Sequence, residues 1–235
     1  MNKSMNKHYN MDAMKTKRLL KCGVIGGPFF VITFLIEGVT RADYNWLRHP
    51  VSSLALGDSG WVQVANFIIT GLLMFAFAIG LWCTLRAPGG STWGPLLVAL
   101  FAIGLLGAGI FLTDPVSGYP PGTPDLHLEY SSNSARLHDL FGIPVFIGLP
   151  LACFVFWRWF ARLGEHGWAI YSAVSGFVML VSFVLASLGF AQAEGLADFG
   201  GLFQRISIIV GLGWVTLLAI HLLRAPSKTA RGMSG

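Results

Sequence analysis

The sequence predicts an all-α integral membrane protein, a bundle of six transmembrane helices with both termini in the cytoplasm. Hydrophobic residues make up 54% of its 235 residues and charged residues only 11%, whereas about a quarter of the residues in an ordinary soluble domain are charged. The apolar residues form six runs, each close to the roughly 20 residues that cross a hydrocarbon core of about 30 Å. Little chain remains for a soluble domain, so we expect one membrane domain over residues 18–224.

Polar tails flank the six expected spans. Residues 1–17 are rich in lysine and lack an apolar period, which predicts a disordered cytoplasmic tail, and residues 225–235 predict a second one. The transmembrane helices are expected at about residues 19–39, 62–85, 94–113, 138–157, 168–191 and 203–223. The first run is too long for the apolar part of a signal peptide and precedes five more spans, so we expect it to be retained.

Small residues and prolines indicate how these helices pack. Four small residues of the third helix let neighbouring backbones approach closely, and we interpret them as packing sites: Gly104, Gly107, Ala108 and Gly109. Pro144 and Pro150 lie inside the fourth helix, where prolines are tolerated and often cause a kink.

The charged residues predict the orientation in the membrane. With the amino terminus inside, twelve of the 16 Lys and Arg residues lie on the cytoplasmic side, as the positive-inside rule requires. Nine of the 11 acidic residues then lie outside. Orientation in the bilayer thus explains the net charge of +5, and we expect membrane lipids rather than nucleic acid as partners. The expected location is a plasma membrane, such as the bacterial inner membrane.

The first outer loop, residues 41–66, is the most distinctive polar stretch. Its segment from His49 to Leu54 predicts a turn into a short amphipathic helix, with Pro50 at the first helical position. We interpret this segment as an interfacial plug with its ends tied by serine caps at Ser52 and Ser53. A nucleophilic serine is the alternative, although no strand-to-helix elbow surrounds these residues.

The second outer loop, residues 114–139, contains several prolines and is expected to be irregular. Glu37, near the outer end of the first span, needs a cationic partner, and Arg41 and Arg205 are the available ones. The pair is either structural or part of a proton or cation site, and we favour a structural pair. We expect ten side chains to meet in one polar site at the outer face: Glu37, Arg48, His49, Ser52, Ser53, Asn66, Asp114, His138, Asp139 and Arg205.

Three histidines fall on the outer side and raise the possibility of a zinc ion: His49, His127 and His138. Histidine nitrogen and carboxylate oxygen hold zinc and activate a bound water in hydrolases. The spacings match no zinc motif, and interfacial histidines commonly satisfy hydrogen bonds at the polar boundary.

Several of these residues resemble a known family. The similarity rests on Gly27 and Pro28, Glu37, Tyr44, the segment from Arg48 to Leu54, Gly60 to Gln63, Asn66 and Phe67, Asp114 and Pro115, and Leu137 and His138. This combination resembles the bacterial and archaeal membrane proteins grouped as domain of unknown function 998. The resemblance implies six membrane helices with a polar site at the outer face, and it implies no activity.

A second resemblance is to the membrane hydrolases that include alkaline ceramidases and adiponectin-type receptors, which bind zinc with three histidines beside a serine and an aspartate. Ser52 or Ser53, with Asp114, Asp139 and the outer histidines, supply those residue types. That superfamily has seven helices and a His-x-x-x-His pair on the last one, and this chain has neither.

Two functional hypotheses follow. In the first, the protein is a lipid-binding or structural membrane module, in which Arg48 and Arg205 bind an anionic headgroup or hold the loops on the bundle. In the second, it is a zinc-dependent hydrolase of lipids. Transport is less favoured, because no span has the interrupted polar midsection of transporters.

Overall fold

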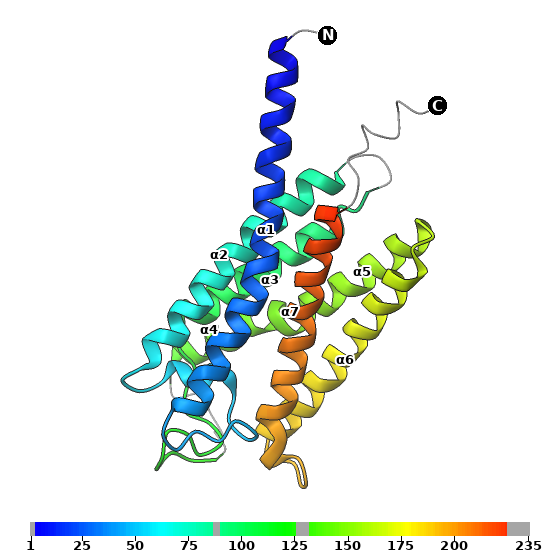
Figure 1. The fold of residues 1–235 in the computed structure, drawn as a ribbon. Coiled ribbons are helices and arrows are strands. Elements are labelled where there is room, and N and C mark those ends of the chain that lie inside the picture. Colours follow the sequence, from blue (N-terminus) through cyan, green and yellow to red (C-terminus); the bar gives the residue numbers. More distant parts are fainter. Residues whose placement is uncertain (1–2, 87–89, 126–131, 225–235) are drawn as a thin grey trace.

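The structure is a computed structural model that describes residues 3–86, 90–125 and 132–224 (Figure 1). Within these residues it contains six helices that are long and apolar enough to cross a membrane. The predicted all-α bundle of six spans is therefore confirmed.

The first three spans are single helices: α1 (Lys3–Thr40), α2 (Gly60–Leu85) and α3 (Trp93–Ile110). The fourth span has three parts: α4 (Asn133–Ile143), the π-helical turn η2 (Pro144–Gly148) and α5 (Leu149–Arg162). The last two spans are α6 (His166–Phe190) and α7 (Gly200–Arg224). Two 3-10 helices lie in the loops: η1 (Val51–Ala55) and η3 (Ala197–Phe199).

The amino-terminal end of α1 differs from the expectation of a disordered tail over residues 1–17. The helix begins at Lys3, about 16 residues before the predicted start of the span. No glycine or proline precedes Gly23, so no residue of this stretch is a strong helix breaker. Residues 225–235, the expected carboxy-terminal tail, lie outside the described residues.

The break in the fourth span coincides with Pro144. Proline lacks the backbone N–H that would bond the carbonyl four residues earlier, and the chain passes through the wider π turn before α5 begins. In Figure 1, α4 lies on the side of α2 and α3, whereas α5 continues to the side of α6.

The six spans form a ring. Neighbours pack in the order α2, α1, α7, α6, α5 and α3, and α3 closes the ring by packing against α2. The fourth span packs on α6 mainly through α5, whereas α4 packs on α3. The ring is therefore least closed between α4 and α6.

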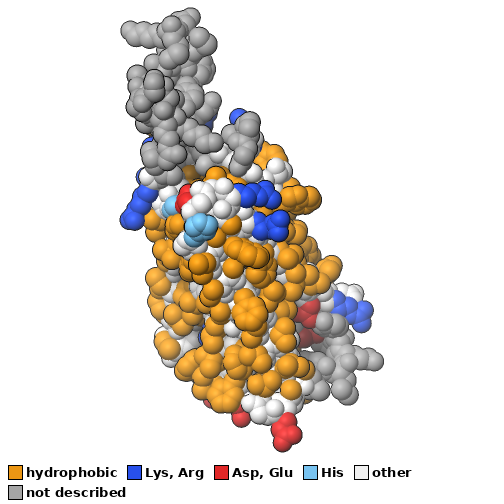
Figure 2. Space-filling model, turned by 90° about the vertical axis from the view of Figure 1, so that its right-hand side faces the viewer, with side chains coloured by type: hydrophobic (Ala, Val, Ile, Leu, Met, Phe, Trp, Pro, Cys, Tyr) orange, Lys and Arg blue, Asp and Glu red, His pale blue; other side chains and the backbone are white. Residues whose placement is uncertain are grey.

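The described ends of the chain lie at the same end of the bundle (Figure 1). We call this end the terminal face, and the opposite end, with residues 41–59, 111–125 and 191–199, the loop face. Figure 2 shows a broad apolar surface with Lys and Arg side chains gathered toward the terminal face and acidic side chains at the loop face. This distribution agrees with the charge sorting on which the predicted orientation rests.

The small residues of α3 pack as predicted. A Cβ atom on Gly104 would lie 2.7 Å from the Phe141 carbonyl oxygen, and one on Gly109 would lie 2.9 Å from Phe67 Cβ. A Cβ atom on Gly107 would overlap the Phe141 ring. The interpretation of these glycines as packing sites is confirmed: Gly104 and Gly107 bring α4 close against α3, and Gly109 brings α2 close against it.

Candidate functional site

Arg205, near the start of α7, holds the first loop against the bundle. Its guanidinium donates hydrogen bonds to the Tyr44 hydroxyl, to the His49 carbonyl (3.0 Å) and to the Gly201 carbonyl (2.9 Å). It also lies over the Tyr44 ring, 5.5 Å from the centroid. Only 3% of Arg205 is exposed, and a buried charge requires such hydrogen bonds. Arg205 thus connects the first loop to α7.

The same loop caps the amino terminus of α7. The Gly201 and Leu202 N–H groups donate to the carbonyls of Arg48 (3.1 Å) and Leu47 (2.8 Å), so two of the helix's free donors are satisfied. A Cβ atom on Gly201 would collide with the His49 carbonyl. Glycine is therefore required for this close approach.

His49 joins the first loop to the second as a neutral ring. The Asn45 N–H donates to its Nδ1 (2.9 Å), so Nδ1 carries no proton, and the Ser117 carbonyl accepts a hydrogen bond from the ring. Burial, followed by the charges of Arg48 and Arg205, lowers the pKa of His49. Both ring nitrogens are occupied within the protein.

Arg48 binds three segments of the loop face. Its Nε donates to the Ser117 carbonyl (3.1 Å), and its two terminal nitrogens pair with Asp125 (2.8 Å) and Asp198 (3.0 Å). Both acidic side chains are largely exposed, and exposed ion pairs contribute about 0–1 kcal/mol each. All three guanidinium nitrogens are used in holding the loops together.

Glu37 pairs with Arg41 (3.1 Å), one of the two cations expected for it. Arg41 also donates to the carbonyls of Leu54 and Leu56, each at 2.9 Å. The pair therefore ties the end of α1 to η1. Among the described residues the second carboxylate oxygen of Glu37 is buried without a hydrogen-bond partner.

The predicted short helix after His49 is present as η1, but serine caps do not hold it. Pro50 occupies the N-cap position and makes no side-chain cap. Ser53 is fully buried, and its hydroxyl has no partner among the described residues. Ser52 is half-buried and faces a cavity. The expectation of serine caps is wrong, because Gln204 accepts the hydrogen bond of the Val51 N–H at the start of η1 and Arg41 donates to the carbonyls at its end.

Asn66 lies inside the bundle. Its amide nitrogen donates to the Phe30 carbonyl and to Gln63 Oε1, each at 3.1 Å. These contacts join α2 to α1, so Asn66 has a packing role.

The second loop places His138 and Asp139 on the first turns of α4. Asp114 accepts hydrogen bonds from the Ser132 N–H (3.1 Å) and hydroxyl (2.8 Å). The Ser132 hydroxyl in turn accepts from the Ala135 N–H (3.0 Å), which is an N-cap. Asp114 therefore fixes the start of the helix that carries the other two side chains.

His138 is held by its Nδ1, which lies 2.8 Å from the Phe111 carbonyl oxygen. A carbonyl only accepts, so Nδ1 carries the proton of the neutral ring. Only 8% of His138 is exposed, and its ring meets Phe67 edge to face. Nε2 is therefore the atom left with a free lone pair.

A cleft of about 610 Å³ lies between α4 and α6 at the loop face. We call it the outer cleft. Its polar lining comes from the loops, α4, α6 and α7: Ser52, Thr113, Asp114, His138, Asp139, Ser187 and Gln204. Its apolar wall comes mainly from the fourth span and α6: Ile143, Phe146, Ile147, Phe183 and Phe190.

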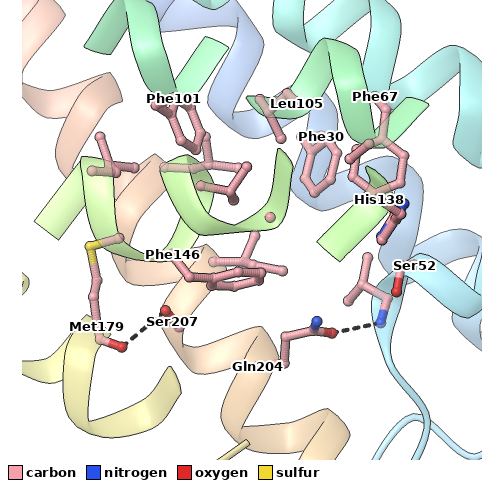
Figure 3. A pocket seen from close by; sticks show the side chains of 17 residues that line it. Phe30, Ser52, Phe67, Phe101, Leu105, His138, Phe146, Met179, Gln204 and Ser207 are labelled. Atoms are coloured by element: carbon pink, nitrogen blue, oxygen red, sulfur yellow. Dashed lines mark hydrogen bonds between the residues drawn. The ribbon is translucent and has the colours of Figure 1, made fainter. Parts of the chain in front are cut away.

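A smaller inner chamber of about 60 Å³ adjoins the outer cleft. Figure 3 shows the aromatic side chains around it, with His138 and Ser52 at one side and Gln204 reaching in from α7. Five residues line both spaces: Ser52, His138, Gly142, Phe146 and Gln204. The two spaces therefore adjoin each other across these five residues.

The structure does not bring the ten predicted site residues into one cavity. Four of them line the outer cleft: Ser52, Asp114, His138 and Asp139. The other six line neither space: Glu37, Arg48, His49, Ser53, Asn66 and Arg205. The side chains of five of these hold loops and helices together, whereas the Ser53 hydroxyl is buried without a partner among the described residues. The polar layer therefore divides into a set of structural contacts and a cleft.

The predicted zinc ligands do not form a group among the described residues. No cluster of three or more His, Cys, Asp or Glu side chains in the described part of the chain has the geometry to hold a metal ion. His49 uses both ring nitrogens within the protein, and His127 lies outside the described residues.

Sequence reasoning missed much of the cleft lining. No pattern in the sequence marked Ser187, Gly142, Phe146 and Phe183 as residues of one cleft. Gly142 was the most informative of these residues in the sequence. A glycine two residues before Pro144 carries no side chain, which indicates a space beside the helix at this point.

The fold and this cleft define a polytopic helical membrane protein. The family model for "Protein of unknown function (DUF998)" matches residues 24–221. The chain therefore belongs to this family, as its first loop indicated. Neither the curated proteins nor the solved structures contained a match.

Proposed function

We propose that the protein binds an amphiphile of the lipid class in the outer cleft. The observation that carries this proposal is the composition of the cleft, which joins a polar rim at the loop face to an apolar wall. Its volume of about 610 Å³ falls within the roughly 300–1,000 Å³ of small-molecule sites. A ligand with a polar end and an apolar end matches both parts.

Access from the side of the bundle supports a lipid ligand. Ile143 is 55% exposed and Ile147 36% exposed, although both also line the cleft. Ser187 is exposed on the facing side of α6. An apolar margin between two spans admits a molecule from the bilayer without passage through water.

The rim favours a neutral or cationic headgroup. Among the described residues that line the outer cleft, the ionisable side chains are Asp114, His138 and Asp139, and none is Lys or Arg. Arg48 and Arg205, expected either to bind an anionic headgroup or to hold the loops on the bundle, donate to groups of the loops and of α7. Hydroxyl or amine donors therefore suit this rim better than a phosphate.

Filling the cleft tests the proposal. A Cβ atom on Gly142 meets nothing within 4 Å, and the same is true of Gly213 on α7, which lies outside both spaces. Gly142→Phe and Gly213→Phe are thus matched variants. Native mass spectrometry of detergent-purified protein would count bound 1-oleoylglycerol, with anionic lysophosphatidate as the comparison.

We expect 1-oleoylglycerol to bind the parent and Gly213→Phe with one-to-one saturation, and binding to Gly142→Phe to fall at least tenfold. Lysophosphatidate should bind more weakly than 1-oleoylglycerol. Equal binding to both variants, or the absence of saturable binding to the parent, would overturn the proposal.

Zinc-dependent hydrolysis of a lipid stays a prediction. Its test is elemental analysis of protein without a polyhistidine tag. Near-stoichiometric zinc that is lost in His138→Ala would support it, and metal-free folded protein would contradict it.

A further inference from the structure

Five residues lie between the outer cleft and the inner chamber, and we call them the neck: Ser52, His138, Gly142, Phe146 and Gln204. Three of them carry polar side chains, and these come from η1, α4 and α7, which are distant in the sequence. The chamber behind the neck is lined almost entirely by apolar side chains. A ligand that passes through the neck therefore places its own polar group among these three side chains.

The polar side chains of the neck are oriented by bonds made through their other atoms. His138 Nδ1 binds the Phe111 carbonyl (2.8 Å), which leaves Nε2 as an acceptor. Gln204 Oε1 accepts from the Val51 N–H (2.7 Å), which leaves its NH₂ group as a donor. Figure 3 shows this second bond and the position of Gln204 below Ser52.

Ser52 supplies the third group. Its hydroxyl makes no hydrogen bond with the described residues, and the serine is half-buried in η1. Val51, the residue that precedes Ser52 in η1, is the one held by Gln204. The neck thus contains a hydroxyl, a basic nitrogen and an amide donor, and the side chains of His138 and Gln204 are fixed by the protein.

We propose that this neck is an acyl-transfer site for an amphiphile that carries a short acyl group in ester or amide linkage. The proposal rests on amphiphile binding in the outer cleft. The amphiphile body lies along the outer cleft, the carbonyl lies in the neck, and the acyl group enters the inner chamber. The chamber's volume of about 60 Å³ is roughly twice the 30 Å³ share of one water molecule in the liquid, so only a few carbons fit.

The reaction balances without a further reagent except water. Ser52 Oγ attacks the carbonyl carbon while His138 Nε2 takes the hydroxyl proton, as in other serine acyl transfer. The Gln204 NH₂ group donates to the developing oxyanion. His138 then returns the proton to the leaving alcohol or amine as its bond to carbon breaks. His138 then takes a proton from a water molecule that attacks the acyl carbon, and it returns this proton to Ser52 Oγ as the acyl–oxygen bond breaks, which releases a carboxylic acid.

A fluorophosphonate probe tests the nucleophile directly, because a serine activated in this way displaces fluoride from phosphorus and retains the phosphonyl group. The chain provides a matched control in Ser53, which is adjacent, buried and outside both spaces. Peptide mass spectrometry should locate the adduct on Ser52 in the parent and in Ser53→Ala. Labelling should be lost in Ser52→Ala, with its thermal unfolding midpoint unchanged.

Two further variants separate chemistry from structure. His138→Gln should slow labelling by about 10²-fold or more, the usual contribution of a general base. Gln204→Glu keeps the acceptor for the Val51 N–H but removes the donor, and we expect a loss of about 10²-fold. Hydrolysis of 4-nitrophenyl butyrate by the parent should exceed that of the octanoate ester, because the inner chamber is small.

Equal labelling of Ser52→Ala and the parent would overturn the inference, as would an unlabelled parent. If such a parent still binds 1-oleoylglycerol, the acyl-transfer inference fails while the binding proposal stands. Labelling at Ser52 without any amphiphile binding would instead contradict the binding proposal, and with it the substrate class inferred here.

Discussion

The removal of the Arg205 guanidinium tests how the loop face is held together. Arg205→Met keeps an unbranched side chain of similar length on α7 but deletes the donors to Tyr44, His49 and Gly201. Hydrogen bonds that involve a charged group contribute about 1.5–3 kcal/mol each. Deletion of the cation also removes the cost of burying it, so we expect a net loss of about 3 kcal/mol, well below the sum of three such bonds.

The matched control is Arg224→Met, the same substitution at an exposed position on the same helix. For a chain of this size, a loss of about 3 kcal/mol corresponds to a fall in Tm of roughly 6–12 °C. Thermal unfolding of detergent-purified protein, followed by circular dichroism, measures the change. We expect Arg224→Met to stay within about 1 °C of the parent. An equally small shift for Arg205→Met would refute the assignment of Arg205 as the link between the first loop and α7.

Three further predictions concern packing, pH and orientation. Gly107→Ala should destabilise the protein by about 1–3 kcal/mol in the same unfolding assay, because its Cβ would overlap Phe141; an unchanged Tm would contradict this. The pKa of His49 is lowered in the folded protein, so the unfolded chain binds more protons at this residue. The contribution of His49 to the free energy of unfolding is therefore complete above about pH 6.5 and is lost as the pH falls. His49→Gln should flatten the loss of stability between pH 7 and 5, and an unaltered pH profile would count against this account. In a background without native cysteines, an impermeant maleimide should label Asp58→Cys but not Glu165→Cys in intact cells, and the reverse pattern would invert the predicted orientation.

The helices were predictable because the bilayer constrains them more strongly than any local interaction. An apolar run of about 20 residues has few alternatives to a spanning helix, and the six spans followed from this alone. Pro144 likewise indicated a break in the fourth span. The direction of that break was not predictable, because it depends on how α4 packs on the glycines of α3.

The polar site was predicted only in part, because residue type does not reveal which atoms are already bonded. Arg48 and Arg205 carry the charge expected of a headgroup site, yet carbonyls and acids of the loops occupy their donors. His49 and His138 look equivalent in the sequence. Only the structure shows that the first uses both nitrogens within the protein, whereas the second presents one nitrogen to the neck.

The central claim, that the outer cleft holds an amphiphile, is tested most directly by crosslinking from inside it. A photoreactive benzoylphenylalanine would replace Phe183, which lines the cleft, or Phe177, which is 65% exposed on the same helix and outside it. After irradiation in lipid vesicles that contain 1-oleoylglycerol, we expect a saturable adduct of this molecule at position 183. At position 177, we expect adducts with each lipid only in proportion to its share of the vesicle. Adducts in the same proportions at both positions would show that the cleft holds no specific amphiphile and would contradict the account.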